Sequence, residues 1–189
     1  LEMIHIPLGS QSAFKNEAGA IFLGPSDERD RQMDRMCETV RMASEAGLRG
    51  LNYNITILGH LRTEASTGRG GAKLSTFDYD KLDQSLPEFE GGPADEDEMW
   101  ERIAHWLKCI IPVAEEYKIQ MACHPSDPGI GNGVTYRGVA RPLGMADGFR
   151  KLIDLYGSPY DGLSFCQGCM SESLENPAED IFDVIRFFG

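Results

Sequence analysis

Short apolar runs alternate along this chain with longer segments in which apolar residues recur every three or four positions. The short runs are bounded by Gly, Pro or polar residues, which is typical of buried strands. The longer segments have the spacing of amphipathic helices. The pattern predicts strands over residues 1–7, 51–58, 119–124 and 163–166, and helices over 26–47, 95–114, 146–156 and 177–188.

The ends of the predicted helices carry residues with known terminal preferences. Ser26 is a typical N-cap, and Gly47 is a typical C-terminal stop. The acidic run from Asp95 to Glu98 suits the start of the second helix, because negative charge there is favoured by the helix dipole. The weakly periodic stretch 62–97 is long for a connection, and such loops are usually lids or mobile functional segments.

Four strand–helix units imply a parallel sheet, because a crossover helix returns each strand in the same direction. A four-stranded open sheet would satisfy this pattern, but the chemistry at the strand ends favours a (β/α)8 barrel. The predicted fold class is therefore α/β, a parallel (β/α)8 TIM barrel of which the chain covers about four βα units. We expect residues 1–189 to form one domain that is truncated at one or both ends, since Leu1 is not an initiator Met.

Composition and charge exclude several classes of function. The 189 residues include 18 Lys and Arg against 30 Asp and Glu, a net charge of −12, and such a surface repels nucleic acid and anionic membranes. No apolar run reaches the roughly 20 residues that span a bilayer. The five cysteines are odd in number and lie in apolar contexts, which suits reduced thiols in the cytoplasm. The expected partner is a small molecule, and assembly into a homo-oligomer is left open.

Two of the predicted strands end in side chains that bind metals. An apolar run ends in His124 before Pro125, and a second one ends in Cys166 before a Gln-Gly pair. The carboxyl ends of barrel strands converge on one cavity. An imidazole and a thiolate that meet there would suit Zn, Fe or Mn with added oxygen ligands. Asp127 is placed to orient His124 without touching the metal.

These residues also have plainer interpretations. A lone His at a strand end is about as often a hydrogen-bonded structural residue, and a lone Cys is more often an inert buried thiol. Cys166 and Cys169 form a Cys-x-x-Cys motif, which occurs in redox sites and in halves of zinc ribbons. We do not expect a thioredoxin-type site, because the pattern does not place the motif at the start of a helix. The remaining cysteines have core contexts and two histidines have no informative context: Cys37, Cys109, Cys123, His60 and His105.

A cationic side chain follows the second strand. Arg62 lies at the loop end of that strand, where a guanidinium could bind a substrate carboxylate through two hydrogen bonds. A surface position without function is about equally common for an Arg. Arg137 and Arg141, in the loop after His124, could serve the same purpose with weaker support.

Longer motifs follow one another along the chain. Residues 46–48 and 53–54 precede Leu61-Arg62-Thr63, and the second helix contains Trp100-Glu101-Arg102-Ile103 and a Pro-containing stretch, 111–116. Residues 124–128 read His-Pro-Ser-Asp-Pro, and residues 162–168 read Gly-Leu-Ser-Phe-Cys-Gln-Gly. Together these stretches resemble the UxuA-type mannonate dehydratase family of xylose-isomerase-like TIM barrels.

The resemblance implies an activity and a set of site residues. The family dehydrates D-mannonate to 2-keto-3-deoxy-D-gluconate in hexuronate breakdown. His124 and Cys166 match two of its metal ligands, usually for Mn²⁺ or Fe²⁺. We also expect Asn54, Arg62 and Asp127, which lie in or after predicted strands, to contact the sugar acid. The remaining ligands and the acid–base groups would lie outside this segment, so the segment alone is expected to be inactive.

The chain also departs from the family pattern. Ser126, Gly129 and Gln167 replace residues that are common in the family, and Cys169 with Met170 replaces small residues. These changes fall in the expected pocket and leave the substrate open. The alternatives are a sugar isomerase or epimerase on the same barrel, which needs a neutral pocket, and a non-catalytic or redox thiol protein built on Cys166 and Cys169.

Overall fold

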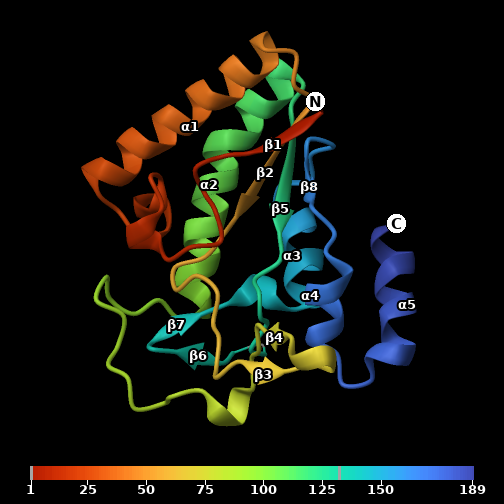
Figure 1. Ribbon diagram of the computed structural model, residues 1–189. Coiled ribbons are helices and arrows are strands. Elements are labelled where there is room, and N and C mark those ends of the chain that lie inside the picture. The colour runs from red at the N-terminus through yellow and green to blue at the C-terminus, as the bar shows by residue number, and fades with distance from the viewer. Residues whose placement is uncertain (1, 132) are drawn as a thin grey trace.

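Four parallel strands form the main sheet of the protein. The computed structural model describes residues 2–131 and 133–189, and Figure 1 shows the sheet running through the middle of the molecule. The strands pair in the order β1-β2-β5-β8, which is also their order along the chain. Their bounds are β1 Met3–His5, β2 Gly50–Asn54, β5 Gln120–His124 and β8 Asp161–Leu163.

Strand order and helix placement identify the architecture. A doubly wound sheet reverses its strand order and carries helices on both faces, whereas a barrel wall keeps the order of the chain and carries its helices outside. Here the connections between successive strands run through α1 (Asp27–Glu45), α2 (Glu96–Tyr117) and α3 (Ala146–Tyr156). The four units are therefore successive units of a barrel wall, as the sequence predicts.

The helices begin where capping chemistry predicts. The backbone N–H of Arg29 donates to the Ser26 hydroxyl at 3.1 Å, which caps α1. Asp95 and Glu98 form a reciprocal capping box at the start of α2. The predicted helix over 177–188 is α5 (Pro177–Phe188). A short helix that the pattern does not predict, α4 (Gln167–Glu172), lies between β8 and α5.

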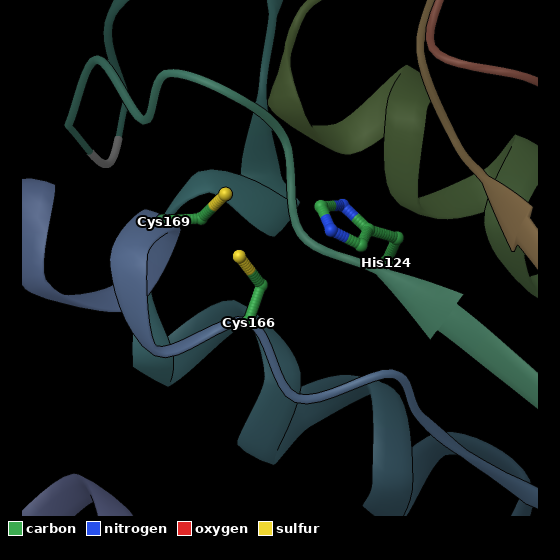
Figure 2. Close-up of side chains that lie close together, drawn as sticks. All are labelled: His124, Cys166 and Cys169. Atoms are coloured by element: carbon green, nitrogen blue, oxygen red, sulfur yellow. The ribbon is translucent and has the colours of Figure 1, made fainter.

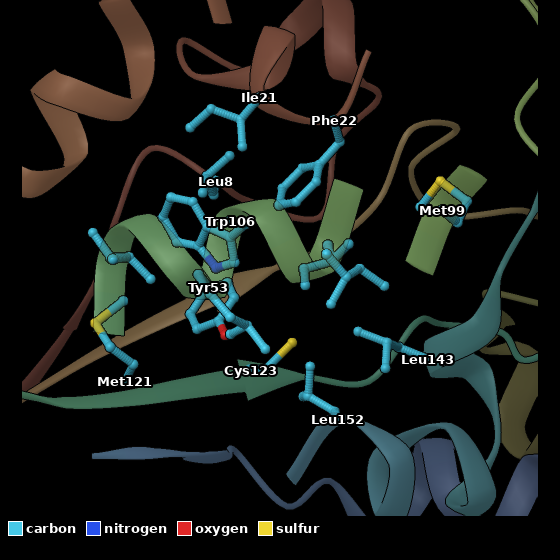
Figure 3. Close-up of a cluster of buried hydrophobic side chains, with 14 of the residues drawn as sticks. Leu8, Ile21, Phe22, Tyr53, Met99, Trp106, Met121, Cys123, Leu143 and Leu152 are labelled. Atoms are coloured by element: carbon cyan, nitrogen blue, oxygen red, sulfur yellow. The ribbon is translucent and has the colours of Figure 1, made fainter. Parts of the chain in front are cut away.

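The core lies between the sheet and the helices. In a strand, alternate side chains face opposite sides of the sheet, and Leu51, Tyr53, Met121 and Cys123 all face the helices and are fully buried. Figure 3 shows Trp106 of α2 packed over Tyr53, with their ring centroids 5.5 Å apart. This contact fixes α2 against the centre of the sheet, because large aromatic rings bury the most apolar area.

The opposite face of the sheet is more polar and more open. It carries Asn52, Gln120 and His124, which are partly or fully exposed. In a barrel this face points into the interior, and its carboxyl edge carries the functional groups. The sheet therefore has one face built for packing and one edge available for chemistry.

Two small hairpins lie beyond the carboxyl ends of the strands, at the bottom of the view in Figure 1. One is β3 (Ser66–Thr67) with β4 (Lys73–Leu74), and the other is β6 (Thr135–Tyr136) with β7 (Val139–Ala140). The predicted lid segment 62–97 thus contains a hairpin of its own. The connecting segments also form single 3₁₀ turns over Ala13–Lys15, Gly19–Phe22, Arg69–Gly71, Tyr79–Lys81 and Pro142–Gly144.

Two strand predictions need correction. The second strand ends at Asn54 and does not reach residue 58, and the fourth spans Asp161–Leu163 in place of residues 163–166. The apolar run continues past Leu163, but among the described residues a single further sheet bond follows, from Ser164 N–H to the Cys123 carbonyl at 2.8 Å. The first strand is confirmed over Met3–His5, and Leu1 lies outside the described residues. Over the described ranges, no helix has the length and apolar character needed to cross a bilayer.

Candidate functional site

Three potential metal ligands meet at the carboxyl edge of the sheet. The ligand atoms of His124, Cys166 and Cys169 all lie within 4.8 Å of one another. Figure 2 shows the imidazole and the two thiols pointing toward a common point. The convergence predicted for His124 and Cys166 is thus present, and the structure adds Cys169, which the sequence suggests only as a redox partner.

The last residue of β5 presents its imidazole with a defined tautomer. The Nδ1 atom of His124 lies 2.8 Å from the carbonyl oxygen of Pro125. A carbonyl can only accept, so Nδ1 carries the proton and Nε2 of the neutral ring keeps its lone pair. The expectation that Asp127 orients His124 is wrong, because the Pro125 carbonyl has that role. The ring is therefore prepared to bind a cation through Nε2.

The two cysteines lie at the start of α4. Cys166 is the N-cap of this helix, and its carbonyl accepts the N–H of Met170 at 3.1 Å. Cys169 is the third helical residue, and N-cap and N3 side chains reach toward each other, as in a capping box. The expectation that this Cys-x-x-Cys motif does not open a helix is therefore wrong. Six-residue helices are too short to produce a clear hydrophobic period, which is why the pattern misses α4.

The Cys169 thiol is strongly held in its neutral form. Burial, the adjacent Cys166 and the charges of Asp127 and Glu172 together raise the pKa of Cys169 to about 12. A bound divalent cation reverses this balance, because a coordinating thiol loses its proton.

The spacing of the three groups fits a divalent cation. Tetrahedral zinc with bonds of about 2.3 Å to sulfur requires sulfur atoms about 3.8 Å apart. The observed limit of 4.8 Å between any two ligand atoms leaves an adjustment of about 1 Å, which is within reach of side-chain rotation. An imidazole and two thiols are a donor set that divalent transition metals bind.

A cavity of about 550 Å³ opens beside this cluster. Its wall is formed by the segment 62–79 with its hairpin, by Asp127 to Ile130, and by Glu172 of α4. This volume lies in the range of small-molecule sites. Asp127 and Glu172 connect the cavity to the cluster, since both charges act on the Cys169 thiol.

Arg62 and Asp127 form an ion pair on the cavity wall. Arg62 Nη2 donates to Asp127 Oδ2 at 2.7 Å, and Nε and Nη1 donate to Ser75 Oγ and to the Leu61 carbonyl, each at 2.7 Å. Burial acts to raise the pKa of Asp127, but the Arg62 hydrogen bond and nearby positive charges lower it overall. Because a guanidinium has five N–H groups, these three bonds leave two N–H groups of Arg62 for a ligand.

His60 belongs to the same network, although its sequence context gives no sign of it. Its Nε2 lies 3.9 Å from Asp127 Oδ2. Burial lowers the pKa of His60, Asp127 opposes this shift, and the positive charges of Arg62 and Arg141 add to the lowering. This contact joins residues far apart in sequence, so no local pattern could reveal it.

Three other predicted binding residues are engaged elsewhere. Asn54 is buried at the end of β2, and its side chain hydrogen-bonds a ring nitrogen of His5 at 3.0 Å. Arg141 is buried and donates to the carbonyls of Pro128, Gly59 and Asp127, which ties the loops after β2 and β5 together. Arg137 donates to Pro87 and Glu88 carbonyls. The suggestion that Arg137 or Arg141 binds a substrate carboxylate stays a prediction, and the burial of Arg141 makes its guanidinium the less accessible of the two.

Sequence comparison with known proteins agrees with the fold and the strand-end motifs. A family model described as D-mannonate dehydratase (UxuA) matches residues 89–189, more than half of the chain. A mannonate dehydratase of Thermotoga petrophila is 25% identical over 193 residues, covering 85% of this chain and 52% of the relative. One of Geobacillus thermodenitrificans is 28% identical over 192 residues, covering 85% of this chain and 50% of the relative. The chain thus spans about half the length of the curated relatives it matches.

Structural comparison gives the same class of fold. The crystal structure of a mannonate dehydratase from Streptococcus suis serotype 2 superposes with a TM-score of 0.76 at 21% identity, covering all of this chain and 51% of that one. The protein is therefore of the TIM-barrel class, with about four βα units of the barrel in this chain. Within that class, the chain belongs to the D-mannonate dehydratase (UxuA) family.

Proposed function

We propose that this protein forms part of a metal-dependent hydro-lyase that converts D-mannonate to 2-keto-3-deoxy-D-gluconate. The observation that carries the proposal is the meeting of His124 and Cys166 at the carboxyl edge of a barrel wall, beside a cavity of about 550 Å³. Family membership supports a sugar acid as the substrate class. It also supports a divalent cation as the cofactor, and the sequence resemblance implies Mn²⁺ or Fe²⁺.

The reaction removes the proton alpha to a carboxylate and expels a neighbouring hydroxyl. A divalent cation, when bound, stabilises the negative charge that develops on the substrate oxygens. His124 Nε2 and the Cys166 thiolate would hold this cation at the strand ends. Their fixed positions matter because charge stabilisation requires the positive centre to be in place before the proton leaves.

The cavity wall supports recognition of an acid. Arg62 keeps two N–H groups after its three internal bonds, and Asp127 fixes its orientation through the bond at 2.7 Å. A substrate carboxylate that accepts from these groups would face the metal ligands. In this proposal Asp127 acts on the substrate indirectly, by orienting Arg62. Asn54 lies at the carboxyl end of β2, where a hydrogen bond with His5 fixes its side chain.

A redox thiol protein is the second candidate, because Cys166 and Cys169 do open a helix, as in redox Cys-x-x-Cys sites. The attacking thiol of such sites has a lowered pKa. Burial and the neighbouring Cys166 raise the pKa of Cys169 to about 12, so the Cys169 thiol is not an attacking thiolate at neutral pH. The His124 imidazole beside both thiols favours metal binding over redox exchange, because a redox pair does not need a third ligand.

The proposal is tested on the full-length protein that contains this segment, by incubating it with D-mannonate and Mn²⁺ and measuring the 2-keto-3-deoxy acid. His124→Ala is expected to abolish turnover, and His105→Ala, a matched change on α2 away from the cavity, is expected to leave turnover unchanged. A protein that binds a divalent cation but converts a neutral sugar in place of D-mannonate would support an isomerase or epimerase. Full turnover in His124→Ala would contradict the proposed site.

A further inference from the structure

We propose that Cys169 is a third metal ligand, and that the resulting donor set of one imidazole and two thiolates selects Zn²⁺ over Mn²⁺. This inference rests on the metal site of the proposed function and concerns which ion that site prefers. It differs from what the sequence resemblance implies, which is a site without Cys169 that holds Mn²⁺ or Fe²⁺.

The first argument is geometric. Cys169 is held at the third position of α4 and Cys166 at its N-cap, so the helix itself sets the distance between their side chains. The Cys169 thiol lies close to the Cys166 thiol and to the His124 imidazole, and every pair of ligand atoms is within 4.8 Å. Figure 2 shows its sulfur directed to the side on which His124 lies. A cation bound to His124 and Cys166 therefore lies within reach of Cys169.

The second argument is the surroundings of the Cys169 side chain. Cys169 is only 6% exposed, whereas Cys166 and His124 are half-buried. The buried sulfur would shield one side of a bound cation from water. The buried Cys123 differs from Cys169 in its surroundings. Its side chain faces the helices, where the sulfur lies 3.8 Å from the carbonyl oxygen of His124 and packs in the apolar core.

The third argument is donor chemistry. Mn²⁺ prefers carboxylate, carbonyl and water oxygens, whereas thiolates favour softer ions such as Zn²⁺. Each thiolate that replaces an oxygen ligand therefore shifts the preference away from Mn²⁺. The ligands that the resemblance places outside this segment would complete the coordination, and the two thiolates within the segment would set the preference for the softer ion.

The test is a metal competition on the reduced protein. The protein is equilibrated with equal concentrations of Zn²⁺ and Mn²⁺, and the bound metals are measured by elemental analysis. We expect the wild type to hold zinc. Cys169→Ser is expected to lower the Zn²⁺ affinity by about 100-fold, at the upper end of losses seen for indirect partners, and to change the Mn²⁺ affinity much less. Cys169→Ala provides a second variant, and Cys37→Ser on α1 is the matched control, expected to behave as the wild type.

Cobalt substitution gives a readout that does not depend on affinity. The sulfur-to-cobalt absorption in the near ultraviolet reports bound thiolates, and we expect it to fall by about half in Cys169→Ser, since one of two thiolates is lost. An unchanged band and an unchanged Zn²⁺ to Mn²⁺ ratio in both Cys169 variants would overturn the inference and leave the proposed site of His124 and Cys166 standing. A wild-type protein that binds neither ion would overturn both.

Discussion

The helix-covered face of the sheet and its carboxyl edge differ in what their residues do. On the covered face, Tyr53, Cys123 and Trp106 are buried among apolar neighbours and hold the helices in place. At the carboxyl edge, His124 and Cys166 are half-buried and directed at one point beside a cavity. Cys123 of β5 packs in the core, whereas Cys166, the N-cap of α4, points into the candidate metal site. Both cysteines lie in short apolar runs of the sequence.

This contrast shows that the position of a residue along a strand matters as much as its type. Residues within a strand are committed to one face by the pleat, and their environment is set by the helices above. Residues at the carboxyl end of a strand or just after it lie where the loops of neighbouring units bring them together. Substitutions should therefore change stability on the covered face and binding at the carboxyl edge.

The largest effect on stability is expected from Trp106→Ala. Trp106 is fully buried against Tyr53 and Phe22, and truncation of such a side chain leaves a cavity. We expect a loss of about 4 kcal/mol in the free energy of unfolding, measured by urea denaturation. Phe182→Ala, on an exposed side chain of α5, is the control and should change it by less than about 0.5 kcal/mol. Similar losses in both variants would contradict the core assignment.

The next largest effect is expected from Asp161→Asn on the covered face. Both carboxyl oxygens of Asp161 are buried without a hydrogen-bond partner among the described residues, and burial raises the pKa of Asp161 to about 7. The folded protein therefore binds this proton more tightly than the unfolded chain. The stabilisation by the protonated group is complete below the ordinary Asp pKa of about 4 and is lost as the pH rises through about 7.

The wild type should accordingly lose stability between about pH 4 and about pH 7, and Asp161→Asn should not. At about pH 6, about two units above the ordinary Asp pKa, the variant should be more stable than the wild type by about 3 kcal/mol, since one pKa unit corresponds to about 1.4 kcal/mol. Urea denaturation across this range measures the difference. Asp183→Asn, on an exposed residue, is the control. A pH profile that is the same in Asp161→Asn and the wild type would contradict the burial of this carboxyl.

The smallest effect on stability is expected from Arg62→Ala at the carboxyl edge. The Arg62–Asp127 pair is partly exposed, with 32% and 22% of the two side chains accessible, so its loss should cost less than about 1 kcal/mol. Loss of a charged contact to the substrate should instead raise the KM for D-mannonate by about 10- to 100-fold. Urea denaturation measures the effect on stability, and steady-state kinetics measures the effect on KM. A large loss of stability with an unchanged KM would contradict the proposal that Arg62 binds the substrate carboxylate.

The sequence predicts much of the covered face and part of the carboxyl edge. The helix over 146–156 is found with the same bounds as α3, because its apolar period and its glycine stop are local signals. The start of α4 at Cys166 is missed, since one and a half turns give no period. The partner of Asp127 is Arg62, 65 positions away, and a pairing at that distance depends on the tertiary fold. The burial of Arg141 also depends on the tertiary fold, since its guanidinium binds carbonyls in the loops after β2 and β5.

Metal stoichiometry tests the central claim most directly, that the carboxyl edge binds a divalent cation. The protein is loaded with metal, dialysed and subjected to elemental analysis, together with Cys166→Ala and the covered-face variant Cys123→Ala. The account predicts one bound ion per chain in the wild type and in Cys123→Ala, and none in Cys166→Ala. Equal metal content in Cys166→Ala and the wild type, or no metal in any of the three, would contradict it.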